Sequence, residues 1–114
     1  MQHFDSFAAL IRNFKTLHYP GRIYVQGDHW KHLPSAKFWV ISSSEVKEQD
    51  AVSTPFGDVP ESLVSHQVRS LLDTGMFQDL IEEKYNRHPE KGLEDIEGFN
   101  QAIIYYLMND DFMD

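Results

Sequence analysis

Apolar residues near the start of the chain recur at the spacing of one helical face. These positions are Phe4, Phe7, Ala8, Ile11, Phe14 and Leu17, with Leu10 beside them. This period predicts an amphipathic helix over about residues 4–18. Asp5 or Ser6 can cap its start, because a side-chain oxygen there accepts a hydrogen bond from a free backbone N–H group. Pro20 and Gly21 end the pattern.

Two segments after this helix have the composition of β-strands. Residues 22–27, RIYVQG, alternate and are rich in strand-forming side chains. Residues 37–43 hold four consecutive large apolar side chains, Phe38 to Ile41, which indicates burial on both faces of a sheet. The connection DHWKHLPSA has nine residues, too many for a tight turn. We therefore expect an antiparallel pair with a wide loop, or alternatively a longer sheet with a third strand near residues 51–56.

The following segment, residues 44–60, is polar and contains two prolines, so it is predicted to be a loop that can hold one short extended piece. Helical spacing then returns. A first stripe lies within residues 63–72 and stops at Gly75, and a second runs from Met76 to Tyr85 and stops at Pro89. These two stretches predict a bent pair of helices.

A last helix is predicted over about residues 93–108, with apolar residues on most sides of its C-terminal half. Asn109 is suited to the left-handed position that closes such a helix. Beyond it, Phe112 and Met113 are predicted to fold back as a clasp, or to form a contact patch rimmed by Asp110, Asp111 and Asp114.

Helices and strands are segregated rather than alternating in this prediction. That order favours the α+β class, with an N-terminal helix, a small antiparallel sheet of two or three strands, and three C-terminal helices. A length of 114 residues fits a single domain, residues 1–114.

Charge is divided unevenly along the chain, whose net charge is −8. Residues 1–43 carry five Lys or Arg and two acids, a net charge of +3, whereas residues 44–114 carry five Lys or Arg and sixteen acids, a net charge of −11. An acidic surface repels phosphate, which disfavours direct nucleic-acid binding, and it attracts a basic protein. The other interpretation is that the excess acid only keeps a small protein soluble.

Composition argues against cysteine-based sites, a signal peptide and a membrane-spanning segment. The absence of Cys excludes disulfides, thiolate chemistry and Cys-based zinc sites. The first residues lack the basic and apolar regions of a signal peptide, and no stretch approaches the ~20 apolar residues of a membrane span. We expect a cytoplasmic protein with no membrane partner and no cofactor, and an unknown oligomeric state.

Catalytic and metal-binding signatures are weak. His29 and His32 could share a zinc ion if their segment were helical, but Gly27 and Pro34 indicate a loop and no third ligand is evident. The acidic residues follow no calcium-loop spacing, and no serine lies in a nucleophile motif. The sequence therefore predicts a protein that is not an enzyme and holds no metal.

A resemblance covers about half of the chain, residues 58–114. The segments LLDTGMFQDLIEEKYNRHP and GFNQAIIYYLMNDDFMD resemble a family of short bacterial proteins of undefined biochemical activity. Members of that family end with a helix, a Tyr-Tyr pair, Asn-Asp and Phe, and the corresponding residues here are Tyr105, Tyr106, Asn109, Asp110 and Phe112. The upstream segment DVPESLV resembles the Pro-Glu entry to the helices of that family.

In size, acidity and lack of a catalytic motif, the chain is also similar to immunity proteins of bacterial toxin systems, such as those of contact-dependent growth inhibition. This similarity implies a protein that binds a cognate toxin, often a basic nuclease, and occludes its active surface. The residues predicted to bind the partner are Glu45, Glu48, Asp50, Asp58 and Glu61, a second patch of Asp110 and Asp111, and the aromatic anchors Trp30 and Tyr105.

Two alternatives from other functional classes stay open at this point. One is a small metal-dependent enzyme or binding module that uses His29 and His32 with nearby carboxylates. The other is a subunit or adaptor of a housekeeping complex, whose partner would be neither basic nor toxic.

Overall fold

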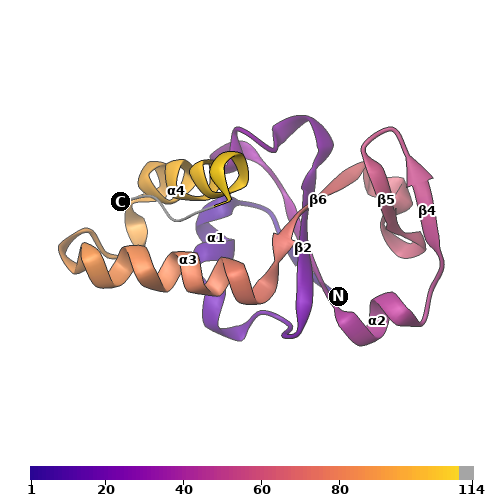
Figure 1. Cartoon of the computed structure of the whole chain (residues 1–114), viewed down its shortest axis with the longest axis horizontal. Helices are drawn as coiled ribbons and strands as arrows, with labels where there is room; N and C mark the ends of the chain where they lie inside the picture. Colours follow the sequence, from indigo (N-terminus) through magenta and orange to yellow (C-terminus); the bar gives the residue numbers. More distant parts are fainter. Residues whose placement is uncertain (111–114) are drawn as a thin grey trace.

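A four-stranded antiparallel sheet divides the molecule into two sides (Figure 1). Its strands lie in the order β1 (Gln2–Phe4), β3 (Phe38–Ser42), β2 (Gly21–Gln26) and β6 (Val68–Asp73). One face is covered by the helices α1 (Phe7–Arg12), α3 (Thr74–Arg87) and α4 (Ile96–Asn109). The structure is a computed structural model and describes residues 1–110.

The other face of the sheet is covered by a lobe made of residues 43–66 (Figure 1). The lobe contains helix α2 (Ser43–Lys47), a hairpin of β4 (Ala51–Thr54) and β5 (Gly57–Pro60), and the 3₁₀ helix η4 (Glu61–His66). It connects β3 to β6, which run in the same direction because each is antiparallel to β2. The remaining 3₁₀ helices are η1 (Phe14–Thr16), η2 (Gly27–His29), η3 (Leu33–Ser35) and η5 (Pro89–Glu94).

Each face of the sheet has its own apolar core. On the helical side the buried side chains include Phe7, Ile23, Val25, Phe38, Val40, Leu72, Phe77, Ile81, Phe99 and Ile103. On the lobe side they are Tyr24, Trp39, Ile41, Val59, Leu63 and Val68. Consecutive residues from Phe38 to Ile41 therefore alternate between two cores, which confirms the predicted burial of β3 on both faces.

The predicted layout, with a helix first and three helices last, is wrong from its first element. The expected helix over residues 4–18 is preceded by the edge strand β1 and is cut short at Arg12. Ser6 has an extended backbone, and its Oγ accepts a hydrogen bond from the Ala9 N–H at 3.1 Å, so α1 begins only after it. Asn13 ends α1, and its Nδ2 donates to the Ala9 carbonyl at 2.7 Å.

The helix predicted within residues 63–72 is also wrong. Residues Glu61–His66 form η4, Gln67 has a left-handed backbone with φ 54° and ψ 53°, and Val68–Asp73 form strand β6. The bent pair of helices around Gly75 therefore does not exist, because Gly75 lies inside α3 directly after a strand. Asp73 caps α3 by accepting a hydrogen bond from the Met76 N–H at 2.8 Å.

A β-bulge in β6 explains why this strand has a helix-like pattern. Pairing with β2 moves from Tyr24 and Ser70 to Ile23 and Leu72, which leaves Leu71 without a partner position. Leu71 and Leu72 both pack into the helical-side core, whereas Val68 packs on the lobe side. The three buried positions thus have the i, i+3, i+4 spacing of one helical face.

The segment 44–60, predicted to be a loop, contains α2, β4 and β5. A strand does lie near residues 51–56, but it belongs to a separate two-stranded sheet, so the predicted extension of the main sheet is wrong. The predicted number of two or three strands is also wrong, because β1 and β6 pair with the two expected strands and make the main sheet four-stranded. Val52 faces Val59 in that hairpin.

The end of α4 differs from the prediction by one residue. Asn109 is the last helical residue, and Asp110 takes the left-handed conformation with φ 55°, its N–H donating to the Tyr106 carbonyl at 2.7 Å. The Asn109 Nδ2 donates instead to the Tyr105 carbonyl at 3.0 Å. The clasp predicted for Phe112 and Met113 lies outside the described residues.

Asp95 joins α3 to the start of α4. Its Oδ1 accepts a hydrogen bond from the Gly98 N–H at 3.2 Å, and its Oδ2 accepts one from Lys84 Nζ at 2.9 Å. The hydrogen bond from Lys84 is the main cause that lowers the pKa of Asp95 below its ordinary value.

Replacing Asp95 by Asn should therefore cost stability in a pH-dependent way. Asn keeps a capping oxygen but loses the charge, so we expect a loss of about 0.5–1 kcal/mol at neutral pH. Because the folded-state pKa is lowered, the carboxylate contributes above its ordinary pKa of about 4, and that contribution is lost as the pH falls further. Urea unfolding of wild type and Asp95→Asn at neutral and acidic pH measures the difference, which should shrink in acid. An equal difference at both pH values would contradict this account.

Candidate functional site

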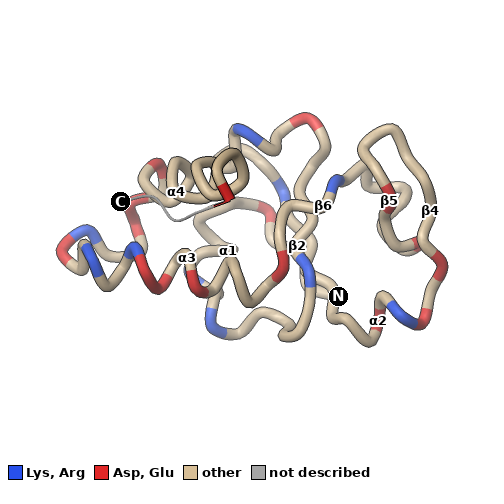
Figure 2. The backbone as a smooth tube through the Cα atoms, viewed as in Figure 1, with Lys and Arg blue, Asp and Glu red and all other residues tan. Residues whose placement is uncertain are grey.

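The lobe gathers most of the carboxylates that the sequence predicted as partner-binding (Figure 2). It carries five acids and one lysine, Lys47. The acids are Glu45 and Glu48 at α2, Asp50 before β4, Asp58 in β5 and Glu61 in η4. Residues spread over seventeen positions of the chain therefore lie on one small unit that projects from the sheet.

Hydrogen bonds within the lobe fix the positions of these acids. Ser42 Oγ accepts from the Glu45 N–H at 3.2 Å and caps α2. The side chain of Gln49 links α2 to η4, because it donates to the Glu45 carbonyl at 3.0 Å and accepts from the Ser62 N–H at 2.7 Å. Glu45, Glu48 and Glu61 consequently line one hollow of about 490 Å³, together with Gln49 and Ser62.

Four of the five lobe carboxylates are exposed and pair with no cation of the described residues. Among residues 1–110, the side chains of Glu48, Asp50, Asp58 and Glu61 make no ion pair or hydrogen bond. Their charges are therefore not neutralised within the described part of the chain. Such a group of like charges raises the local concentration of cations and attracts positively charged surfaces.

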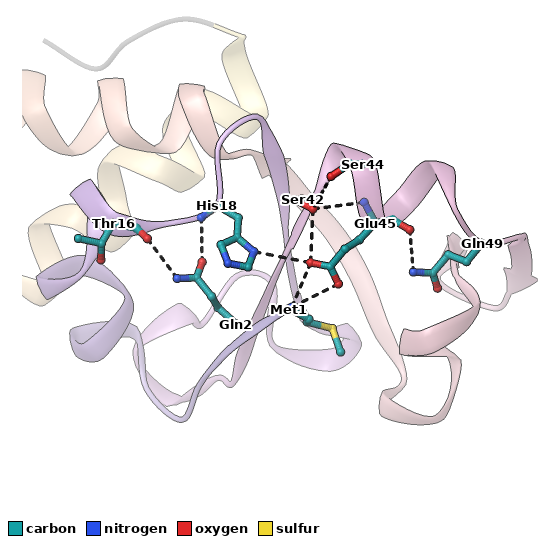
Figure 3. Close-up of polar contacts among 8 residues, drawn as sticks. All are labelled: Met1, Gln2, Thr16, His18, Ser42, Ser44, Glu45 and Gln49. Atoms are coloured by element: carbon teal, nitrogen blue, oxygen red, sulfur yellow. Dashed lines mark hydrogen bonds and ion pairs between the residues drawn. The ribbon is translucent and has the colours of Figure 1, made fainter.

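Glu45 is the exception, because it is engaged at the start of the chain (Figure 3). The ammonium of Met1 lies 3.0 and 3.2 Å from its two carboxylate oxygens, and His18 Nδ1 lies 3.7 Å from Oε1. The hydrogen bond from this ammonium is the largest cause that lowers the pKa of Glu45. Gln2 supports the arrangement by accepting from the His18 N–H at 2.8 Å.

The other predicted partner-binding residues are not part of this group. Tyr105 is 40% exposed on α4, and Asp110 follows that helix, so both lie on the helical side of the sheet. Asp111 lies outside the described residues. Trp30 is half-buried and lines a separate hollow that it shares with Asp58.

The two histidines weighed as zinc ligands lie in the loop after β2. His29 ends η2 with its Nδ1 atom buried and without a hydrogen-bond partner, and His32 is exposed. In the part of the chain that the structure describes, no group of three or more His, Asp or Glu side chains is placed to hold a metal ion. Over the same residues, no helix has both the length and the apolar character that crossing a bilayer requires.

Two residues beside Trp30 were not predicted as functional. The guanidinium carbon of Arg69 lies 5.5 Å from the centre of the Trp30 ring and 5.8 Å from the centre of the Phe56 ring. Residues 30, 56 and 69 are far apart in the sequence, so no local pattern connects them. The one available indication was Phe56 itself, a large aromatic residue inside the polar turn segment TPFGD.

Comparison with protein-family models, with curated proteins and with solved structures gives no match to this chain. The resemblance over residues 58–114 therefore stays a prediction.

Proposed function

We propose that this protein is an immunity-type binding protein that uses its lobe to bind a basic toxin and occlude the active surface of that toxin. The observation that carries the proposal is the set of four exposed carboxylates on the lobe, which no described cation neutralises. We infer that the toxin is of the nuclease class, because a surface that binds the phosphates of a nucleic acid also binds a cluster of carboxylates.

The distribution of charge favours a role of the acids in binding a partner over a role only in keeping the protein soluble. A surface that only needs to stay soluble is well served by acids and bases interspersed over its area. The lobe instead carries one lysine against five acids, on a unit that projects from the sheet (Figure 2). Long-range attraction to a projecting acidic unit accelerates association with a basic protein.

The lobe carboxylates are expected to contribute unequally to binding of the partner. Glu48, Asp50 and Glu61 are free to pair with the partner, and Asp58 extends this group toward Trp30. Glu45 contributes less, since the Met1 ammonium already neutralises it. Tyr105 and Asp110 form a second proposed patch near the C-terminal end of α4, a helix whose Leu107 lines the same hollow as Asp58.

The decisive experiment is recovery of the partner from native cells. The tagged protein is purified at low salt together with the co-expressed product of the neighbouring gene. We expect one basic protein at equal stoichiometry, which is toxic when expressed alone and harmless when this chain is present. A neighbouring product without toxicity, or a partner with no basic surface, would remove the proposal in favour of an adaptor function.

Salt dependence gives a separate test of the electrostatic mechanism. Raising the ionic strength screens charges on exposed surfaces over a distance of about 10 Å at 0.1 M. We therefore expect the association rate with the basic partner to fall steeply with salt, while the dissociation rate changes little. Stopped-flow or surface-plasmon measurements at several salt concentrations give both rates. An association rate that does not change with salt would disprove steering by the lobe.

A further inference from the structure

A second hollow lies where the lobe meets the end of the main sheet. Its volume is about 390 Å³, within the usual range for sites that bind small molecules. Four separate segments contribute to its wall: the loop after β2, the turn of the β4–β5 hairpin, strand β6 and helix α4. The wall includes Trp30, Phe56, Asp58, Arg69 and Leu107.

The aromatic wall at Phe56 is held in place by close packing. A Cβ atom added to Gly27 would lie 2.6–2.7 Å from atoms of the Phe56 ring, so the ring rests directly on the backbone of a glycine. The hairpin turn is fixed by Thr54, whose Oγ1 accepts from the Phe56 N–H at 3.1 Å and donates to the Gly57 carbonyl at 2.7 Å. The wall is therefore built before any ligand arrives.

Arg69 supplies a positive charge close to two aromatic rings. Its guanidinium is half-buried and contacts the Trp30 and Phe56 rings, yet among residues 1–110 it makes no ion pair and its side chain no hydrogen bond. Because no described residue accepts a hydrogen bond from the guanidinium, its N–H groups are available to a ligand. A planar fork of this kind is complementary to a carboxylate, which it binds through two parallel hydrogen bonds. Lys31, with Nζ 4.8 Å from the Trp30 ring, adds a second positive charge nearby.

Asp58 makes the hollow bipolar. This exposed carboxylate lines the same hollow as Arg69 and has no described cation as a partner. A ligand with only a negative charge would be attracted by Arg69 and repelled by Asp58. A ligand with only a positive charge would be attracted by Asp58 and repelled by Arg69. A ligand with both charges satisfies the two residues together, and its apolar part can rest against Trp30, Phe56 and Leu107.

We propose that this hollow binds a free α-amino acid with a large apolar side chain. The carboxylate of the ligand pairs with Arg69, its ammonium lies toward Asp58, and its side chain packs against the aromatic wall. This site overlaps the proposed toxin contact of the lobe only at Asp58. Binding of the amino acid requires only the isolated protein.

Titration of the purified full chain with L-phenylalanine tests the proposal. Binding is followed by isothermal calorimetry and by the change in tryptophan fluorescence, which reports on Trp30 because the only other tryptophan, Trp39, is buried and does not line the hollow. We expect one saturable site, with millimolar or better affinity. Phenylalanine amide, which lacks the carboxylate, and N-acetylphenylalanine, which lacks the ammonium, should each bind about tenfold more weakly or worse. Absence of saturable binding, or equal affinity for either analogue, would overturn the proposal.

Substitutions locate the site. Arg69→Gln should lower the affinity for phenylalanine by about tenfold or more, and Arg69→Lys should restore part of it, because lysine keeps the charge but not the fork. Arg22→Gln is the matched control, since Arg22 is exposed on the neighbouring strand β2 and lines no part of the hollow. If Arg69→Gln does not fold, Asp58→Asn gives the test at an exposed position and should weaken binding several-fold. Unchanged affinity in the folded variants would place any bound phenylalanine elsewhere and disprove this site.

Discussion

Reversing three lobe carboxylates together, by Glu48→Lys, Asp50→Lys and Glu61→Lys, should slow association with the basic partner by ~10- to 1000-fold at low salt. These side chains are exposed, lie on one unit and have no described internal cation, so their charges act on an approaching protein. The dissociation rate should rise as well, because lysines would then face a basic surface. Association kinetics of the triple variant, with circular dichroism to verify folding, measure the effect.

The matched control changes the same total charge on the helical side of the sheet. Asp79→Lys, Glu82→Lys and Glu97→Lys alter three exposed acids of α3 and α4. We expect a much smaller change in the association rate, because only the net charge and not the contact surface is altered. Equal slowing in both triple variants would show that net charge alone acts and that the lobe is not the binding surface. Glu45→Gln should also have little effect, since Glu45 is paired with the Met1 ammonium.

Replacing Phe38 by Ala should destabilise the protein by about 3–5 kcal/mol, the largest stability effect that we expect from a single substitution. Phe38 is fully buried in β3, and its ring centre lies 5.7 Å from that of Phe7. The substitution removes the contact between the Phe38 and Phe7 rings and leaves a cavity between the sheet and α1. Because domains of this kind are stable by only about 5–15 kcal/mol, the variant should lie close to the limit of folding. Urea unfolding gives the free energy directly.

Tyr85→Ala provides the comparison for this substitution. Tyr85 is also aromatic, but it is 41% exposed on α3, so its loss should cost less than about 1 kcal/mol. A similar loss in both variants would mean that the core on the helical side is not packed around Phe38 as described.

The parts of the fold that could be predicted are those in which local pattern and tertiary environment agree. Strands β2 and β3 lie almost where alternation and the run from Phe38 to Ile41 placed them, because both are interior strands and pair with each other in a regular register. Strand β1 has only three residues at the sheet edge, too few to show a period of two. Strand β6 was mistaken for a helix because its bulge places Leu71 and Leu72 on the same side.

The lobe could not be predicted because its core comes from elsewhere in the chain. Val59 and Leu63 are the buried apolar residues of its own segment, and they pack against Tyr24, Trp39 and Ile41 of the sheet. The acidic residues were nevertheless identified as a group, since they lie within residues 45–61 and need only a compact segment to come together. The hollow around Arg69 had no such indication, because its walls come from four segments.

Because the lobe has only a small core, its backbone amide hydrogens should exchange readily with solvent. The amides of β4 and β5 belong to an isolated two-stranded ladder, whereas β2 is paired on both sides. Short peripheral ladders open with free energies well below that of global unfolding, so deuterium should replace hydrogen in β4 and β5 long before it does in β2. A protein that covers the lobe would slow that replacement at these positions alone. The rate of deuterium uptake can therefore map the footprint of the partner on the native chain, without any substitution.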